Sequence, residues 1–322
     1  MHHFSAISAG PESAQLRGNR GRVLAVLSNA VYLRGEAGHI IGITGALAED
    51  GPITLRVADI DLLVPLLKGR EGTTFACIAA FIELEGTARL ELGRARQWQP
   101  QLPATIAGVE ERIKAVRALV GLLSGSWCEA GDCGLAAYLY VPHRSMPLPT
   151  EVTLLRTTSA ISGTVSRKLA EKVTEFQAAA AELESEGAAN ALVALLGLGV
   201  GLTPSGDDIV AGILASLVWQ ARLGSIPPHF AQHMVDAIRE TAPAMTNDIS
   251  VRLLWHAGDG LLYAPAMELG AAMLGGYVVS MAAQTQRLLS IGHSSGADMA
   301  VGLLAGLVAG IEIEARSIVP TC

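Results

Sequence analysis

The sequence predicts an α+β protein: a small β-barrel-like or β-sandwich-like domain, residues 1–105, followed by a larger helical domain, residues 106–322. Short apolar segments between glycine-containing turns fill the first third of the chain, which is typical of a small barrel or sandwich. After a proline-containing stretch at residues 97–107, apolar residues recur at spacings of three and four, which indicates helices. A segment that occurs twice in the helical part predicts a pseudo-twofold unit of glycine-rich loop and helix.

The individual elements follow from the same patterns. We expect strands at residues 22–33, 39–44, 53–57, 73–84 and 88–92, a hairpin turn at residues 85–87 and a short helix at residues 59–69. One helix is expected over residues 109–123, because its apolar side chains share a face. Residues 166–313 are predicted to be helical, broken by glycine-rich turns.

Composition narrows the class of protein. Half of the residues are hydrophobic, which excludes a disordered chain. The 23 basic and 30 acidic residues give 23 − 30 = −7, which argues against a nucleic-acid or anionic-membrane partner. The four cysteines, Cys77, Cys128, Cys133 and Cys322, are too few for a disulfide scaffold or a complete zinc site, and we interpret them as ordinary thiols.

A mean hydropathy of +0.40 raises the question of a membrane protein. The best candidate for a span, residues 188–206, is uncharged but contains Asn190, Pro204 and Ser205. The apolar runs 209–221 and 299–311 are shorter than a membrane span. We therefore expect core helices and no membrane partner. The first residues contain no apolar signal-peptide core, so a cytoplasmic location is expected.

The repeated segment is the most informative feature. It is SGDDIVAGILASLV from Ser205 and SGADMAVGLLAGLV from Ser295, with eight of fourteen positions identical at an offset of 295 − 205 = 90. Small residues such as Gly212 and Gly302 recur along both copies and would let the two helices approach closely. In each copy Ser is followed three residues later by Asp, which is the pattern of a helix-capping box.

Three features exceed what capping needs. The loop GLGVGLTPSG, residues 197–206, has four glycines in ten residues, Asp207 is replaced by Ala297 in the second copy, and His293 stands beside two serines. If the two helix starts converge, their backbone N–H groups suit an anion. We predict catalytic roles for Asp207, Asp208 and His293, and substrate binding by Gly199, Gly201, Thr203, Ser205, Gly206, Asn247, Ser250, Ser294, Ser295, Gly296 and Asp298.

Cofactors are less well defined than the anion. The acidic cluster would suit a divalent cation or an ammonium or carbamoyl NH₂ donor, but no metal-ligand set is predicted. The loop is not a phosphate-binding Walker A motif, since the Gly-Lys-Ser/Thr sequence is missing. No nucleophile elbow or Ser-His-Asp arrangement is evident either.

GLGVGLTPSGDDIVAGILASL and GHSSGADMAVGLLAGL together resemble the oxamate carbamoyltransferase subunit family AllH, long catalogued as a domain of unknown function. The specific part is Thr203 to Asp208, with residues 292–296 and Asp298 similar to the second motif, and we expect the resemblance to cover most of the chain. It implies a transferase subunit of allantoin (purine) catabolism, which converts oxalurate and phosphate into oxamate and carbamoyl phosphate.

The implied partners are a small anion, such as phosphate, carbamoyl phosphate or an oxamate-like carboxylate, and other protein subunits or further copies of the chain. Two alternatives stay open. One is a non-catalytic assembly subunit whose glycine-rich loops only pack helices. The other is a metal-dependent enzyme acting on a small carboxylate, with the metal at Asp207 and Asp208.

Overall fold

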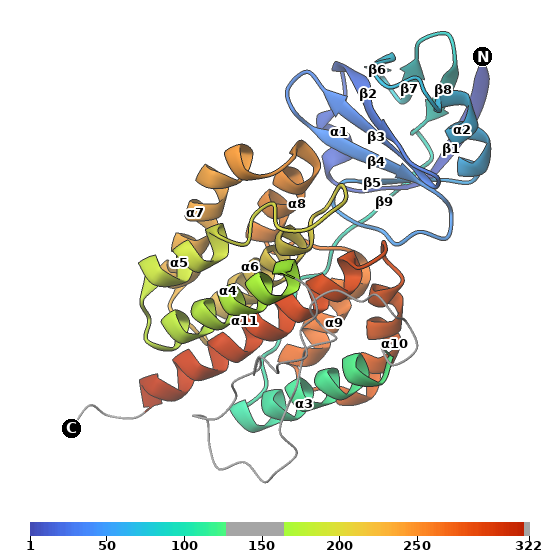
Figure 1. The fold of residues 1–322 in the computed structure, drawn as a ribbon. Coiled ribbons are helices and arrows are strands. Elements are labelled where there is room, and N and C mark those ends of the chain that lie inside the picture. Colours follow the sequence, from blue (N-terminus) through green and yellow to red (C-terminus); the bar gives the residue numbers. More distant parts are fainter. Residues whose placement is uncertain (127–163, 319–322) are drawn as a thin grey trace. The chain divides into compact units, whose positions relative to one another are not determined.

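The computed structural model describes residues 1–126 and 164–318, in two compact units, Met1–Pro100 and Gln101–Cys322 (Figure 1). Cys128, Cys133 and Cys322, which we interpret as ordinary thiols, lie outside the described residues. The domain boundary that we predict between residues 105 and 106 stays a prediction. Each unit is described below by itself.

The first unit is a closed barrel, which confirms the β-barrel interpretation. Its strands are β1 (His2–Ala9), β2 (Arg20–Val26), β3 (Ala30–Gly35), β4 (Ile40–Thr44), β5 (Thr54–Val57), β6 (Thr74–Ile78), β7 (Phe81–Leu84), β8 (Ala88–Glu91) and the short β9 (Arg96–Gln97). They are hydrogen-bonded in the order β5-β4-β3-β2-β6-β7-β8-β1, and β1 pairs with β5 again, so eight strands close the ring. Closure leaves those eight strands with few unpaired edges.

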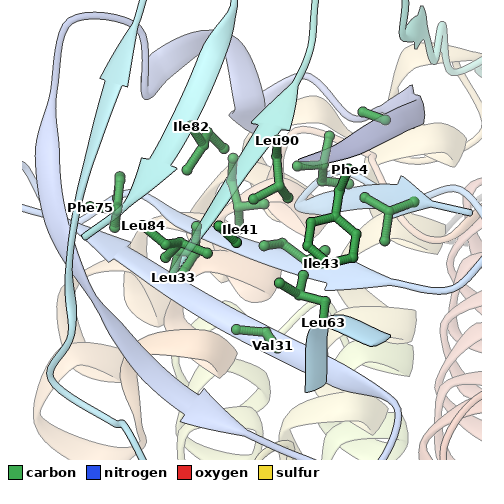
Figure 2. Close-up of a cluster of buried hydrophobic side chains, with 14 of the residues drawn as sticks. Phe4, Val31, Leu33, Ile41, Ile43, Leu63, Phe75, Ile82, Leu84 and Leu90 are labelled. Atoms are coloured by element: carbon green, nitrogen blue, oxygen red, sulfur yellow. The ribbon is translucent and has the colours of Figure 1, made fainter. Parts of the chain in front are cut away.

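Alternating apolar side chains fill the barrel. Figure 2 shows Phe4, Leu33, Ile43 and Leu90 pointing into one cluster, and all four are at most 5% exposed. Helix α2 (Ile60–Leu67) covers part of this core with Leu63, which is fully buried, whereas α1 (Glu12–Gln15) is a single turn. The helix predicted at residues 59–69 is therefore confirmed.

Two of the predicted strands are wrong, because each is a hairpin. Residues 22–33 form β2 and β3, and residues 73–84 form β6 and β7. The second turn carries no glycine, and Ala79 takes the left-handed conformation with φ 53° instead, so the usual turn signal is missing. Strand β1 was also not predicted, although it pairs with both β5 and β8.

The second unit is helical, as predicted. Its helices are α3 (Val109–Ser126), α4 (Thr164–Ala181), α5 (Ser185–Val193), α6 (Ser205–Arg222), α7 (Pro228–Met245), α8 (Asp248–Gly258), α9 (Ala264–Leu274), α10 (Val278–Leu289) and α11 (Ser295–Ile318). Helices α6 and α11 pack along one another, and α11 also contacts α4 (Figure 1). The two copies of the repeated segment therefore form α6 and the first turns of α11.

Small residues set the distance between α6 and α11. A Cβ atom on Gly302 would lie 2.1 Å from the carbonyl oxygen of Ile209, and one on Gly212 would lie 2.4 Å from that of Met299. The two backbones therefore touch with no room for a methyl group between them. The pseudo-twofold relation between the copies stays a prediction.

Among the described residues, α11 is the one helix that is long and apolar enough to cross a membrane, over Ser295–Arg316. Inside the protein, 94% of its most apolar window is buried. Burial of this kind is what the central helix of a packed core shows.

Candidate functional site

The start of α6 differs from the expected capping box. The N-cap of α6 is Pro204, which has no capping side chain, and Ser205 is already the first helical residue. Extended backbone at Pro204, with ψ 143°, turns the chain into the helix one residue earlier than Ser205 would. The capping-box expectation for Ser205 and Asp208 is therefore wrong, and Asp208 is not needed as a cap.

Each glycine-rich loop folds back over the start of its own helix. The N–H of Gly206 donates to the carbonyl of Leu198 at 2.8 Å, and the N–H of Gly296 donates to that of Ile291 at 3.0 Å. A Cβ atom on Gly206 or Gly296 would lie 1.9 or 1.7 Å from the carbonyl oxygen of Leu195 or Leu288 respectively. Both positions therefore require glycine.

Gly199 and Gly201 give the longer loop its shape. Gly199 has φ +122°, and a Cβ atom there would lie 2.6 Å from the backbone nitrogen of Ser205. Gly201, with φ +101°, is exposed and has open space around it. The first therefore packs against the helix start, whereas the second supplies a backbone conformation that other residues rarely adopt.

Two hydroxyl groups connect the starts of the two helices. The oxygen atoms Oγ1 of Thr203 and Oγ of Ser295 are hydrogen-bonded at 2.8 Å, although the residues are 92 positions apart. Both hydroxyls also hydrogen-bond to the Asp208 side chain. The structure thus brings together three of the predicted residues, which we call the α6–α11 junction, with Asp298 close enough to act on Asp208 by its charge.

The carboxyl groups at the junction are buried. Asp207 and Asp208 are 3% exposed, and Asp298 is fully buried. Burial raises the pKa of Asp208 well above its ordinary value; the negative charges of Asp298 and Asp207 add to the rise, and the two hydroxyls oppose it. Oδ2 of Asp208 is buried without a hydrogen-bond partner.

Asp207 is engaged in a different way. Its Oδ1 accepts from the N–H of Gly197 at 2.8 Å, and its Oδ2 accepts from the hydroxyl of Thr246, the C-cap residue of α7. Burial raises the pKa of Asp207, while hydrogen bonds from Thr246, Gly197 and Ser250 lower it. This side chain clamps the glycine-rich loop to the α7–α8 connection.

Thr246 was not among the predicted site residues. It stands immediately before Asn247, and a lone threonine at a helix end gives no signal of a distant carboxylate partner.

Asn247 and Ser250 hold the same loop from α8. Asn247 is the N-cap of α8, where its Oδ1 accepts from the N–H groups of Ile249 at 3.0 Å and Ser250 at 3.1 Å. Its Nδ2 donates to the carbonyl of Leu202 at 2.9 Å, and the Ser250 hydroxyl donates to that carbonyl at 3.5 Å. Both residues therefore reach the loop, and through it they position Thr203.

The other predicted residues lie around the junction. His293 is exposed in the turn before α11, and Ser294 and Ser205 are half-buried. The carbonyl of Ser294 accepts from the N–H of Asp298 at 2.8 Å, inside the first turn of α11. His293 and Ser294 are therefore accessible to solvent, whereas the carboxyl groups of the neighbouring aspartates are buried.

Backbone N–H groups at the start of α6 are largely occupied. Those of Asp207 and Asp208 donate to the carbonyl of Pro204, and that of Gly206 donates to the loop. An anion at this point would therefore depend on side-chain hydroxyls more than on the α6 backbone. The hypothesis from the sequence relied on the backbone N–H groups of both helix starts.

The arrangement does not resemble a metal centre. Over residues 1–126 and 164–318, no group of three His, Cys, Asp or Glu side chains is placed to hold a metal ion. The junction instead combines two hydrogen-bonded hydroxyl groups with buried carboxyl groups.

One family model matches part of the chain. The sequence model of the family described as "Oxamate carbamoyltransferase subunit AllH" matches residues 195–307. This match confirms the resemblance over both helix starts, but it does not extend over most of the chain as expected. No curated protein and no solved structure matches the chain.

Proposed function

We propose that this chain is a subunit of a carbamoyl-transferring enzyme and that the α6–α11 junction binds its small substrate. One observation carries the proposal: the segment matched by the family, residues 195–307, begins just before the first glycine-rich loop and ends within α11. The two starts within that segment are joined by the Thr203–Ser295 hydrogen bond. The family's own description is that of one subunit of an oxamate carbamoyltransferase.

The residues divide into two groups in this proposal. Thr203 and Ser295, with the more exposed Ser294 and His293, donate hydrogen bonds to a phosphate or carboxylate group. Asp207, Asn247 and Ser250 are positioning residues, because their side chains bond to the loop or to each other. Catalysis is then electrostatic positioning of carbamoyl phosphate and an oxamate-like carboxylate, without a covalent nucleophile.

The wider setting follows from the same proposal. A carbamoyltransferase of this kind acts in allantoin (purine) catabolism in the cytoplasm, together with other subunits. In the catabolic direction, phosphate attacks the carbamoyl carbon of oxalurate, so that a C–O bond to phosphate forms and the C–N bond to the oxamate nitrogen breaks. The proton of hydrogen phosphate passes to that nitrogen, and the products are oxamate and carbamoyl phosphate.

A non-catalytic assembly subunit is the second candidate, and the Asp207 contacts favour it. Both oxygen atoms of Asp207 accept hydrogen bonds from the protein, as a purely structural loop clamp would require. The two candidates differ in whether the junction binds a small molecule.

Titration calorimetry of the chain with phosphate, oxamate and carbamoyl phosphate tests the proposal. We expect Thr203→Val and Ser295→Ala each to weaken binding about tenfold or more, because each removes a hydrogen bond to a charged group. Ser290→Ala is the matched control, since its hydroxyl donates to the carbonyl of Arg287 at the end of α10. Binding that is absent, or equally strong in all variants, would sink the proposal and leave the assembly subunit.

A further inference from the structure

One enclosed oxygen atom distinguishes Asp208 from its neighbour Asp207. Its Oδ2 is buried and has no hydrogen-bond partner, whereas both oxygens of Asp207 accept hydrogen bonds. A buried ionised oxygen without a donor is costly. The atom is closed off from solvent, so a proton is the ligand small enough to satisfy it in place.

The surroundings of Asp208 add negative charge and hydroxyls. Asp207 on α6 and Asp298 on α11 act on it as like charges, and both are buried. Thr203 and Ser295 contribute uncharged hydroxyls. From α8, Ser250 faces Asp207, and the one carboxyl in the first turn of that helix, Asp248, is exposed.

The end of α7 and the turn before α11 complete the set of neighbours. Thr246, at the C-cap of α7, brings a hydroxyl to Asp207. His293, in the turn before α11, is exposed. A pH dependence of binding could therefore also come from His293, and the experiment has to distinguish its effect from that of Asp208.

We infer that the α6–α11 junction binds its anion together with one proton, which Asp208 holds as a neutral carboxyl group between the two helix starts. The inference rests on the proposed function, because it concerns the same site. An anion on the hydroxyls of Thr203 and Ser295 would otherwise face several carboxylates in a poorly solvated place, where like charges repel strongly. Protonation from solvent converts one carboxylate into a carboxyl group, and no other bond changes.

The pH dependence of sulfate binding tests the inference. Sulfate keeps its charge from about pH 5 to about pH 9, unlike phosphate, so any change of affinity belongs to the protein. We expect the affinity to fall about tenfold per pH unit above the pKa of Asp208 in the free protein. Calorimetry in buffers of different ionisation enthalpy should report up to one proton taken up per sulfate.

Two variants test which residue takes up the proton. Asp208→Asn, which is neutral and nearly isosteric, should bind sulfate with an affinity independent of pH, and His293→Gln should keep the wild-type dependence. The inference is overturned if the wild-type affinity does not depend on pH, or if Asp208→Asn keeps the wild-type dependence.

If the Asp208→Asn variant does not fold, a measurement on the wild-type chain can replace it. Infrared difference spectra should then show a gain of protonated-carboxyl C=O absorption when sulfate is added above that pKa, and no gain would overturn the inference. If neither sulfate nor phosphate binds at any pH, the proposed function itself fails. That result differs from binding without proton uptake, which removes the inference alone.

Discussion

Replacement of Gly302 by Ala tests the close contact between α6 and α11. The new methyl group would lie 2.1 Å from the carbonyl oxygen of Ile209 and 3.0 Å from Cα of Gly212. Both atoms are backbone, so no side chain can rotate away, and the two helices must separate. Overpacking of this kind costs about 1–3 kcal/mol, and a clash with backbone belongs at the upper end.

The gain in helix propensity from Gly to Ala offsets about 1 kcal/mol of that cost. We therefore expect Gly302→Ala to lower the free energy of unfolding by about 2 kcal/mol, and the melting temperature by about 4–8 °C. Thermal and urea denaturation followed by circular dichroism measure both quantities. Separation of the helices should also lengthen the Thr203–Ser295 contact and weaken anion binding.

Gly121→Ala is the matched control, because a Cβ atom at Gly121 in α3 meets nothing within 4 Å. It should raise the free energy of unfolding by about 0.5–1 kcal/mol, because alanine lowers the conformational entropy of the unfolded chain and favours the helix. If Gly302→Ala is as stable as Gly121→Ala, the two helices do not touch through their backbones and the reasoning fails.

Three other substitutions test separate parts of the account. Thr246→Val leaves one oxygen of Asp207 without its donor, so urea denaturation should show a loss of about 1–3 kcal/mol, and an unchanged midpoint would contradict the clamp. Ala79→Gly removes a strained left-handed alanine from the β6–β7 turn and should stabilise the barrel by about 1 kcal/mol, while Ala80→Gly should not. Burial raises the pKa of Glu312 from 4.5 to about 7, so the folded state holds a proton that the unfolded state loses. Stability should therefore fall as pH rises through the window from 4.5 to about 7, and denaturation of Glu312→Gln at several pH values should lack that fall.

Much of the fold follows from local sequence patterns. Helical periodicity predicts α3, and the segment Glu85-Gly86-Thr87 predicts the β7–β8 turn, where Gly86 has φ +65°. The turn at Ala79 was missed because alanine is not a usual residue for left-handed backbone. Strand β1 pairs with strands far along the chain, so its pairing is a property of the closed barrel rather than of its own residues.

The candidate site was predicted unevenly. The sequence singles out Thr203, Ser295 and Asp208, which the structure brings into hydrogen-bond contact. Thr246 has no counterpart in the sequence pattern, because its partner Asp207 lies 39 positions earlier and only the folded chain brings the two together. The occupied backbone N–H groups at the start of α6 were likewise invisible, since they depend on the path of the loop.

The most direct test of the central claim is a crystal structure of the chain with bound phosphate or carbamoyl phosphate. The account predicts the phosphate group within hydrogen-bond distance of the hydroxyls of Thr203 and Ser295, with Asp208 behind them. Phosphate bound elsewhere, with these two hydroxyls still bonded only to each other and to Asp208, would contradict it.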